Sequence, residues 1–147
     1  MRMTLKLCFV LGLLFSIQTS AQQYPQDYFR SPLDIPLTLS GTFGELRSNH
    51  FHSGIDIKTQ GVEGKNVYAV ADGFVSRIKI SPWGYGHALY ITHPNGYTTV
   101  YGHLKELSGP LAEYLENKQY NQQSFGLDVY LEANELSVKK GQVVAKS

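Results

Sequence analysis

The stretch HSGID at residues 52–56 places a histidine and a carboxylate four positions apart around a glycine. Gly54 and the β-branched residue that follows it disfavour a helix and predict an extended strand. Because side chains alternate along a strand, His52 and Asp56 are expected to project from one face, with empty space between them at Gly54. A neutral imidazole and a carboxylate are ligands that suit zinc. The pattern can supply two ligands of a metal site, and the alternative is a surface histidine and aspartate in a turn.

The sequence around this pattern predicts an antiparallel β domain. Strand-forming runs lie at residues 38–43, 55–57, 67–71, 74–80, 88–92, 97–103, 128–131 and 143–145. The turn sequences DG at 72–73 and NG at 95–96 separate neighbouring runs, and the second of them predicts a hairpin. In the run 74–80, strict alternation places Val75 on the face opposite Ile78.

Two segments depart from the β pattern. Three prolines in residues 22–37 predict an irregular lead-in to the domain. In residues 105–137, a proline at position 110 favours a helix start, and the apolar residues that follow have helical spacing. The polar run at 121–124 is expected to end this helix. The segment is interpreted as a small helical insertion between two strands of the β core.

Residues 1–21 have the pattern of a secretory signal peptide. Arg2 and Lys6 precede or interrupt an apolar run, and small residues at 19–21 offer a cleavage site. The run is shorter than the roughly 20 residues of a membrane span, so export without a stable membrane span is expected. Removing this segment changes the net charge from 13 − 12 = +1 to 11 − 12 = −1 and removes Cys8, the single cysteine. A nearly neutral domain without a basic block argues against nucleic-acid binding.

Several short motifs follow one another along the chain. They are FGELR at 43–47, HSGID at 52–56, VADG at 70–73, GYG at 84–86, ITH at 91–93, NGY at 95–97, YGHL at 101–104 and VKKGQVVA at 138–145. In this combination the chain resembles the lysostaphin/LytM-type zinc metallopeptidases, which cut peptide cross-links of bacterial peptidoglycan. The resemblance covers almost the whole predicted mature domain.

This resemblance implies a fold and a site. The fold expected for residues 38–147 is a β-rich, antiparallel and open barrel-like metallopeptidase domain of the duplicated hybrid motif type. His52 and Asp56 are implied to bind Zn²⁺, and His103 is implied to be catalytic. Tyr101 is expected to share a strand face with His103 and to contact a peptidoglycan peptide. Arg47 is expected to contact this substrate or a carboxylate, the alternative being a solvated side chain on its loop.

The remaining histidines receive other expectations. His50 forms a His-Phe-His pattern with His52, but the family motif selects His52, so His50 is not expected to be a ligand. His87 and His93 lie at the two ends of a predicted hairpin strand and are expected to form structural hydrogen bonds.

The family's last motif is a His-x-His on the following strand, which supplies a zinc ligand and a catalytic histidine. It does not occur up to Ser147. One hypothesis is an exported zinc endopeptidase whose natural chain continues past Ser147, the 147 residues alone being inactive. The alternative is a non-catalytic relative that binds the cell wall or activates a hydrolase. A lipoyl-type or biotinyl-type carrier is disfavoured, because no lysine stands at a suitable hairpin tip.

Overall fold

The computed structural model describes residues 26–147, so the predicted signal peptide lies outside the described residues. The elements are β1 (Leu39–Gly41), β2 (Asp56–Ile57), β3 (Asn66–Tyr68), β4 (Gly73–Ile80), β5 (His87–Thr92), β6 (Thr98–Leu104), β7 (Glu106–Leu107), α2 (Pro110–Gln122), β8 (Leu127–Tyr130), β9 (Ser137–Val138) and β10 (Val143–Lys146). Every strand pairing is antiparallel. Among these residues, no helix is long and apolar enough to cross a membrane.

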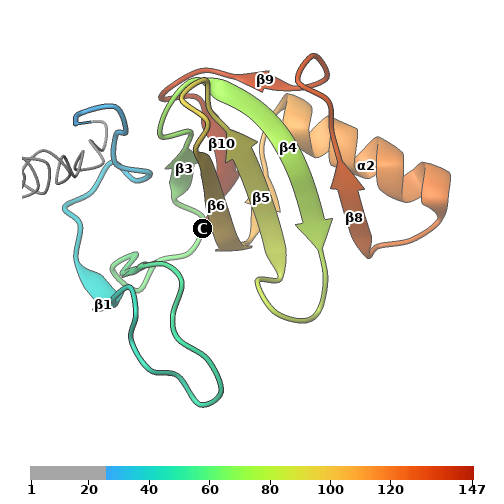
Figure 1. The fold of residues 1–147 in the computed structure, drawn as a ribbon. Helices are drawn as coiled ribbons and strands as arrows, with labels where there is room; N and C mark the ends of the chain where they lie inside the picture. The colour runs from blue at the N-terminus through green and yellow to red at the C-terminus, as the bar shows by residue number, and fades with distance from the viewer. Residues whose placement is uncertain (1–25) are drawn as a thin grey trace, which may run out of the picture.

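Three sheets form from these strands (Figure 1). The largest has the order β6-β5-β4-β8, with β9 also paired to β4. A second sheet has the order β3-β10-β7. Strand β1 pairs with β2, and residues 39–57 form a segment that projects below the main sheet in Figure 1. The predicted β-rich, antiparallel fold class is confirmed, and the sheets of the described residues do not close into a barrel.

One hydrophobic core joins the two larger sheets and the helix. Its fully covered residues include Val75, Ile78 and Leu89 from the main sheet and Val144 from β10, all at 0% exposure. Leu111 on α2 is 1% exposed and belongs to the same cluster. Burial of these aliphatic side chains is the main term that stabilises the two sheets against each other.

The strict alternation predicted for β4 is wrong at its start. Val75 and Ile78 are both fully buried, although they are three positions apart. The register with β5 shifts between Val75 and Arg77, which marks a β-bulge that inserts one extra residue on β4. After the bulge, alternation resumes through Ile78 and Ile80. The β5–β6 hairpin forms as predicted, with Gly96 in its turn at φ 84°.

The segment from 105 to 137 contains the predicted helix and strand and contributes to both larger sheets. Strand β7 pairs with β10, whereas β8 pairs with β4. The helix begins at the predicted proline and buries Leu111 and Leu115. These two leucines belong to the hydrophobic core, so the helix is packed onto the domain through them.

The described part of the lead-in, residues 26–37, is irregular and lies against the domain. The Arg30 N–H donates to the Val70 carbonyl at 2.9 Å, and the Tyr68 N–H donates to the Pro32 carbonyl at 2.9 Å. The Arg30 guanidinium lies over the Tyr68 ring, 4.5 Å from its centroid, and Leu33 is 6% exposed. The lead-in thus covers one edge of β3.

An arginine on the main sheet is held by an ion pair and two aromatic rings. Arg77 donates from Nε and Nη2 to the two carboxylate oxygens of Asp128, both at 2.7 Å. Its guanidinium also lies 5.1 Å from the Tyr90 ring centroid and 4.8 Å from that of Tyr130. The hydrogen bonds and charge of Arg77 hold the pKa of the Asp128 carboxyl below its usual range.

We expect Asp128→Asn to lower the free energy of unfolding at pH 7 by no more than about 1 kcal/mol, because the pair is largely exposed. The lowered pKa means that the ionised carboxylate stabilises the folded state above the unfolded pKa near ~3.9. This stability is lost as pH falls through the lower folded pKa. Urea unfolding should show the variant and the wild type converging in acid. A difference that stays constant from pH 7 to pH 3 would contradict the assignment.

Candidate metal centre

The histidine of the HSGID motif lies on the projecting segment, next to a short bridge between Leu46 and Phe51. The His52 N–H donates to the Glu45 carbonyl at 2.8 Å, and the Gly44 N–H donates to the His52 carbonyl at 2.8 Å. The motif is therefore not one extended strand, since the strand proper begins only at Asp56. The predicted strand from 52 to 57 is wrong in its first half, because His52 pairs within its own loop.

The predicted meeting of histidine and carboxylate nevertheless occurs. His52 Nε2 and Asp56 Oδ1 face each other at 3.3 Å. This distance is longer than an ordinary N–H···O hydrogen bond of about 2.9–3.0 Å. Two zinc ligands with bonds of about 2.0–2.1 Å and a tetrahedral angle stand about 3.3–3.4 Å apart. The donor types and their separation therefore fit two ligands of one zinc ion.

The second ring nitrogen of His52 has a partner suited to a metal ligand. Nδ1 lies 3.0 Å from the Thr42 carbonyl oxygen, which can only accept a hydrogen bond. A proton on Nδ1 leaves the lone pair of Nε2 free, and this arrangement recurs in metal-binding histidines. Nδ1 also lies 3.2 Å from Arg47 Nη2, a donor that would favour the other tautomer. A metal at Nε2 would select the tautomer that Thr42 accepts from.

Arg47 contacts a carboxylate, which was one of its expected roles. Its Nη2 donates to Asp56 Oδ2 at 2.7 Å and to Glu45 Oε2 at 3.4 Å. The ion pair occupies one oxygen of Asp56 and leaves Oδ1 turned toward His52. A Cβ built on Gly41 would overlap both Arg47 Nη2 and Asp56 Oδ2. Glycine at position 41 therefore makes the room that this ion pair needs.

His103 and Tyr101 do not share a strand face. The register between β5 and β6 shifts between His87 and Leu89, so an extra residue lies between Tyr101 and Leu104. His103 has φ 56° at this bulge and is exposed. Tyr101 is 8% exposed, and its hydroxyl accepts a hydrogen bond from the Val70 N–H at 3.0 Å. The expectation of a common face is wrong because the bulge turns His103 outward, and burial raises the pKa of the Tyr101 phenol.

Tyr85 connects the loop that carries the HSGID motif (residues 52–56) with His103. Its hydroxyl lies 3.1 Å from Ser53 Oγ, next to His52 in the chain. Its ring packs edge-on against the His103 ring, with centroids 6.2 Å apart and planes at 77°. The structure thus brings the HSGID and YGHL motifs together through one tyrosine. In the sequence, Tyr85 stands out only as part of the GYG motif at 84–86, which does not indicate these contacts.

The other histidines are arranged differently. His50 is exposed and lies 2.6 Å from the Asn49 side-chain oxygen. His93 is 3% exposed and bonds the Asp72 carbonyl and the Thr99 hydroxyl at 2.8 and 2.9 Å, as predicted. His87 Nδ1 is buried without a hydrogen-bond partner in the described part of the chain, so the bond expected there is not formed. Within residues 26–147, no three His, Cys, Asp or Glu side chains are grouped to hold a metal.

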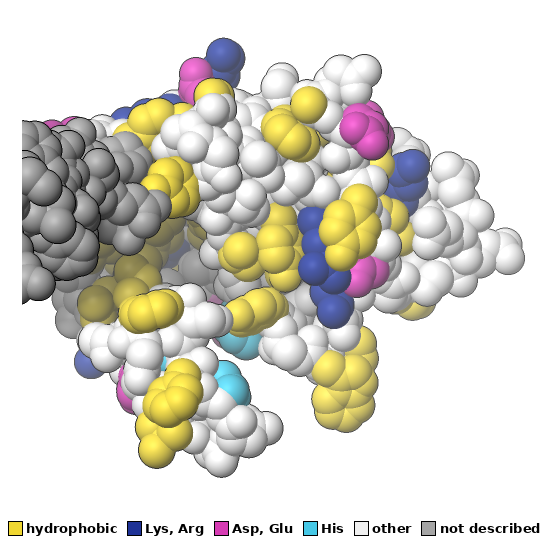
Figure 2. Space-filling model, viewed as in Figure 1, with side chains coloured by type: hydrophobic (Ala, Val, Ile, Leu, Met, Phe, Trp, Pro, Cys, Tyr) yellow, Lys and Arg dark blue, Asp and Glu magenta, His cyan; other side chains and the backbone are white. Residues whose placement is uncertain are grey.

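The surface near the candidate ligands is apolar and exposed. Figure 2 shows hydrophobic and histidine side chains on the segment that projects below the main sheet. Phe43, Leu46 and Phe51 on this segment are 76%, 73% and 69% exposed. The candidate ligands therefore lie on a surface that an extended substrate could approach.

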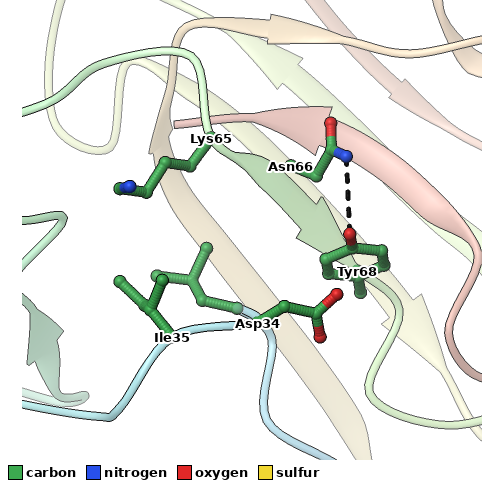
Figure 3. A pocket seen from close by; sticks show the side chains of 6 residues that line it. Asp34, Ile35, Lys65, Asn66 and Tyr68 are labelled. Atoms are coloured by element: carbon green, nitrogen blue, oxygen red, sulfur yellow. Dashed lines mark hydrogen bonds between the residues drawn. The ribbon is translucent and has the colours of Figure 1, made fainter.

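A separate pocket of about 180 Å³ lies between the lead-in and β3 (Figure 3). It is lined by Leu33, Asp34, Ile35, Lys65, Asn66 and Tyr68. The Asn66 side chain donates from Nδ2 to Tyr68 Oη at 3.4 Å, and its Oδ1 accepts from Lys146 Nζ at 2.6 Å. None of the candidate metal or catalytic residues lines it, so this pocket is not the candidate site.

The described residues thus form a β-rich, antiparallel domain in which His52 and Asp56 face each other. Residues 50–120 match the model of peptidase family M23. This match agrees with the resemblance to the lysostaphin/LytM-type family and supports peptidase activity of the metallopeptidase type. No curated protein and no solved structure matches the chain significantly.

Proposed function

We propose that the protein is a zinc-dependent endopeptidase that hydrolyses peptide cross-links of bacterial peptidoglycan. The observation that carries the proposal is the 3.3 Å approach of His52 Nε2 and Asp56 Oδ1 within a family M23 match. Their donor types suit zinc, and their separation fits a tetrahedral ion. The third protein ligand is expected from the family's His-x-His motif, whose presence after Ser147 stays a prediction.

Each residue of the site has a defined task in this proposal. When bound in such a site, zinc would supply Lewis-acid chemistry to a water and to the scissile carbonyl. His52 and Asp56 would hold the ion, and Arg47 holds the second oxygen of Asp56. The exposed imidazole of His103 orients the attacking water or donates a hydrogen bond to the developing oxyanion.

The substrate assignment rests on the family resemblance and on the predicted route of the protein. The signal peptide pattern at residues 1–21 predicts export to the periplasm or the extracellular envelope, where peptidoglycan lies. The exposed apolar segment beside the ligands offers a surface to the peptide stems of this polymer.

The proposal is tested on the full-length protein with purified peptidoglycan. Zinc-loaded protein should release new amino groups, and a chelator should stop this release until zinc is added back. Mass spectrometry of the soluble fragments identifies the bond that is cut. Release that continues after complete metal removal would contradict a zinc peptidase.

A non-catalytic role is the second candidate, because no third ligand groups with His52 and Asp56 among residues 26–147. In that case the full-length protein would sediment with peptidoglycan or stimulate a separate hydrolase without releasing amino groups itself. The same assay therefore separates the two functions.

We expect Gly41→Ala to weaken zinc binding by about 10- to 100-fold, the usual cost of losing a residue that positions a ligand. The added methyl group would displace Arg47 from Asp56. Competition with a fluorescent zinc chelator measures the effect. Gly126→Ala is the matched control, because a Cβ there meets neighbours only at 3.8 Å and beyond. Equal zinc affinity in both variants would show that the Arg47–Asp56 pair does not position the ligand.

A further inference from the structure

We propose that Tyr85 is a positioning residue. It fixes His103 relative to the loop that carries the HSGID motif, through a hydrogen bond to Ser53. This inference rests on the proposed peptidase function. The two motifs it joins are distant in sequence, since Ser53 precedes β3 and His103 lies at the end of β6. Tyr85 precedes β5 in the loop that connects it to β4.

Three contacts of Tyr85 support this role. Its hydroxyl lies 3.1 Å from Ser53 Oγ. Its carbonyl accepts a hydrogen bond from the His103 N–H at 2.8 Å. Its ring lies edge-on against the His103 imidazole. One residue therefore holds both the backbone and the ring of His103 while its far end reaches the loop that carries His52.

The local sequence is adapted to these contacts. A Cβ on Gly102 would lie 3.1 Å from Tyr85 Cδ1, so glycine lets the Tyr85 ring approach β6. Gly84 and Gly86 on both sides of Tyr85 have φ 68° and 63°, which glycine adopts without strain. His103 itself has φ 56°, a conformation that costs free energy in a residue with a Cβ. Such strain persists only where the surroundings enforce it, and Tyr85 is the neighbour that bonds His103 directly.

The Ser53 hydroxyl gives the exposed Tyr85 side chain a defined hydrogen-bond partner. Tyr85 is 47% exposed, so burial alone does not fix its ring. The segment that carries Ser53 is also exposed, with Ile55 at 51%. A hydrogen bond between these two exposed groups reduces the range of distances between His103 and the candidate ligands. Catalysis is sensitive to such distances because misplacement of a reacting group by about 1 Å can cost about 100-fold in rate.

The test is a double-mutant cycle in the full-length, zinc-loaded protein. Tyr85→Phe removes the hydroxyl and keeps the ring, and Ser53→Ala removes its partner. Each single variant should lower kcat for amine release from peptidoglycan about three- to tenfold, with KM and zinc affinity unchanged. The double variant should lose no more than either single variant. Tyr97→Phe, at the other end of the same hairpin, is the matched control and should behave as wild type.

A second readout does not depend on activity. In a histidine-selective ¹H–¹³C NMR spectrum, the Cε1 signal of His103 should be sharp in wild type and Tyr97→Phe. It should broaden or split in Tyr85→Phe and Ser53→Ala. Multiplicative losses of kcat in the cycle, together with an unchanged His103 signal, would overturn the inference. If the wild type does not hydrolyse peptidoglycan, the proposed function fails, and the NMR signal alone decides the role of Tyr85.

Discussion

His52→Ala is expected to abolish zinc binding and peptidoglycan hydrolysis in the full-length protein. The substitution removes the nitrogen that faces Asp56 Oδ1 at 3.3 Å, and one carboxylate cannot replace an imidazole at that point. Zinc content after dialysis, measured by elemental analysis, should fall from near one per chain to background. Amine release from peptidoglycan should fall to the level of the chelated wild type.

His50→Ala is the matched control for this experiment. His50 has the same side chain and lies two residues away, but it is exposed and contacts Asn49 rather than Asp56. It should keep full zinc content and activity. Wild-type activity in His52→Ala, or loss of zinc in His50→Ala alone, would show that the ligand assignment is wrong.

His103→Asn is expected to reduce kcat by about 10²–10⁴-fold while zinc content stays at one per chain. Asparagine tolerates the left-handed backbone that His103 adopts at φ 56°, so the variant separates loss of the imidazole from loss of the fold.

Two further measurements make the His103 prediction specific. Thermal unfolding of His103→Asn should match that of the wild type within a few degrees. His103→Ala should be both less active and less stable, because alanine lacks the tolerance of asparagine for this conformation. A variant with unchanged kcat would remove His103 from the catalytic machinery.

Much of the fold follows from local sequence signals. The Asn-Gly turn at 95–96 and the alternating runs around it predict the β5–β6 hairpin, and the proline at 110 predicts the start of α2. The bulges could not be predicted. The run 74–80 fits regular alternation, which places Val75 and Ile78 on opposite faces, and the extra residue on β4 appears only in the pairing register. The same difficulty placed Tyr101 beside His103 although a second bulge separates them.

The residue types of the candidate ligands could be predicted from the sequence, whereas the residues that position them could not. The spacing of His52 and Asp56 around Gly54 indicates the pair, although a loop rather than a strand brings them together. The roles of Gly41 and Thr42 depend on long-range contacts with Arg47, Asp56 and His52, which leave no pattern in the sequence. The role of Tyr85 likewise depends on long-range contacts with Ser53 and His103 and could not be predicted.

The most direct test is a crystal structure of the zinc-loaded, full-length protein with data collected on both sides of the zinc absorption edge. An anomalous peak about 2.0–2.2 Å from His52 Nε2 and from an Asp56 carboxylate oxygen is the predicted result. Arg47 should still bond the other Asp56 oxygen in that structure. A zinc peak at other side chains, with His52 and Asp56 unliganded, would contradict the metal centre on which the proposed function depends.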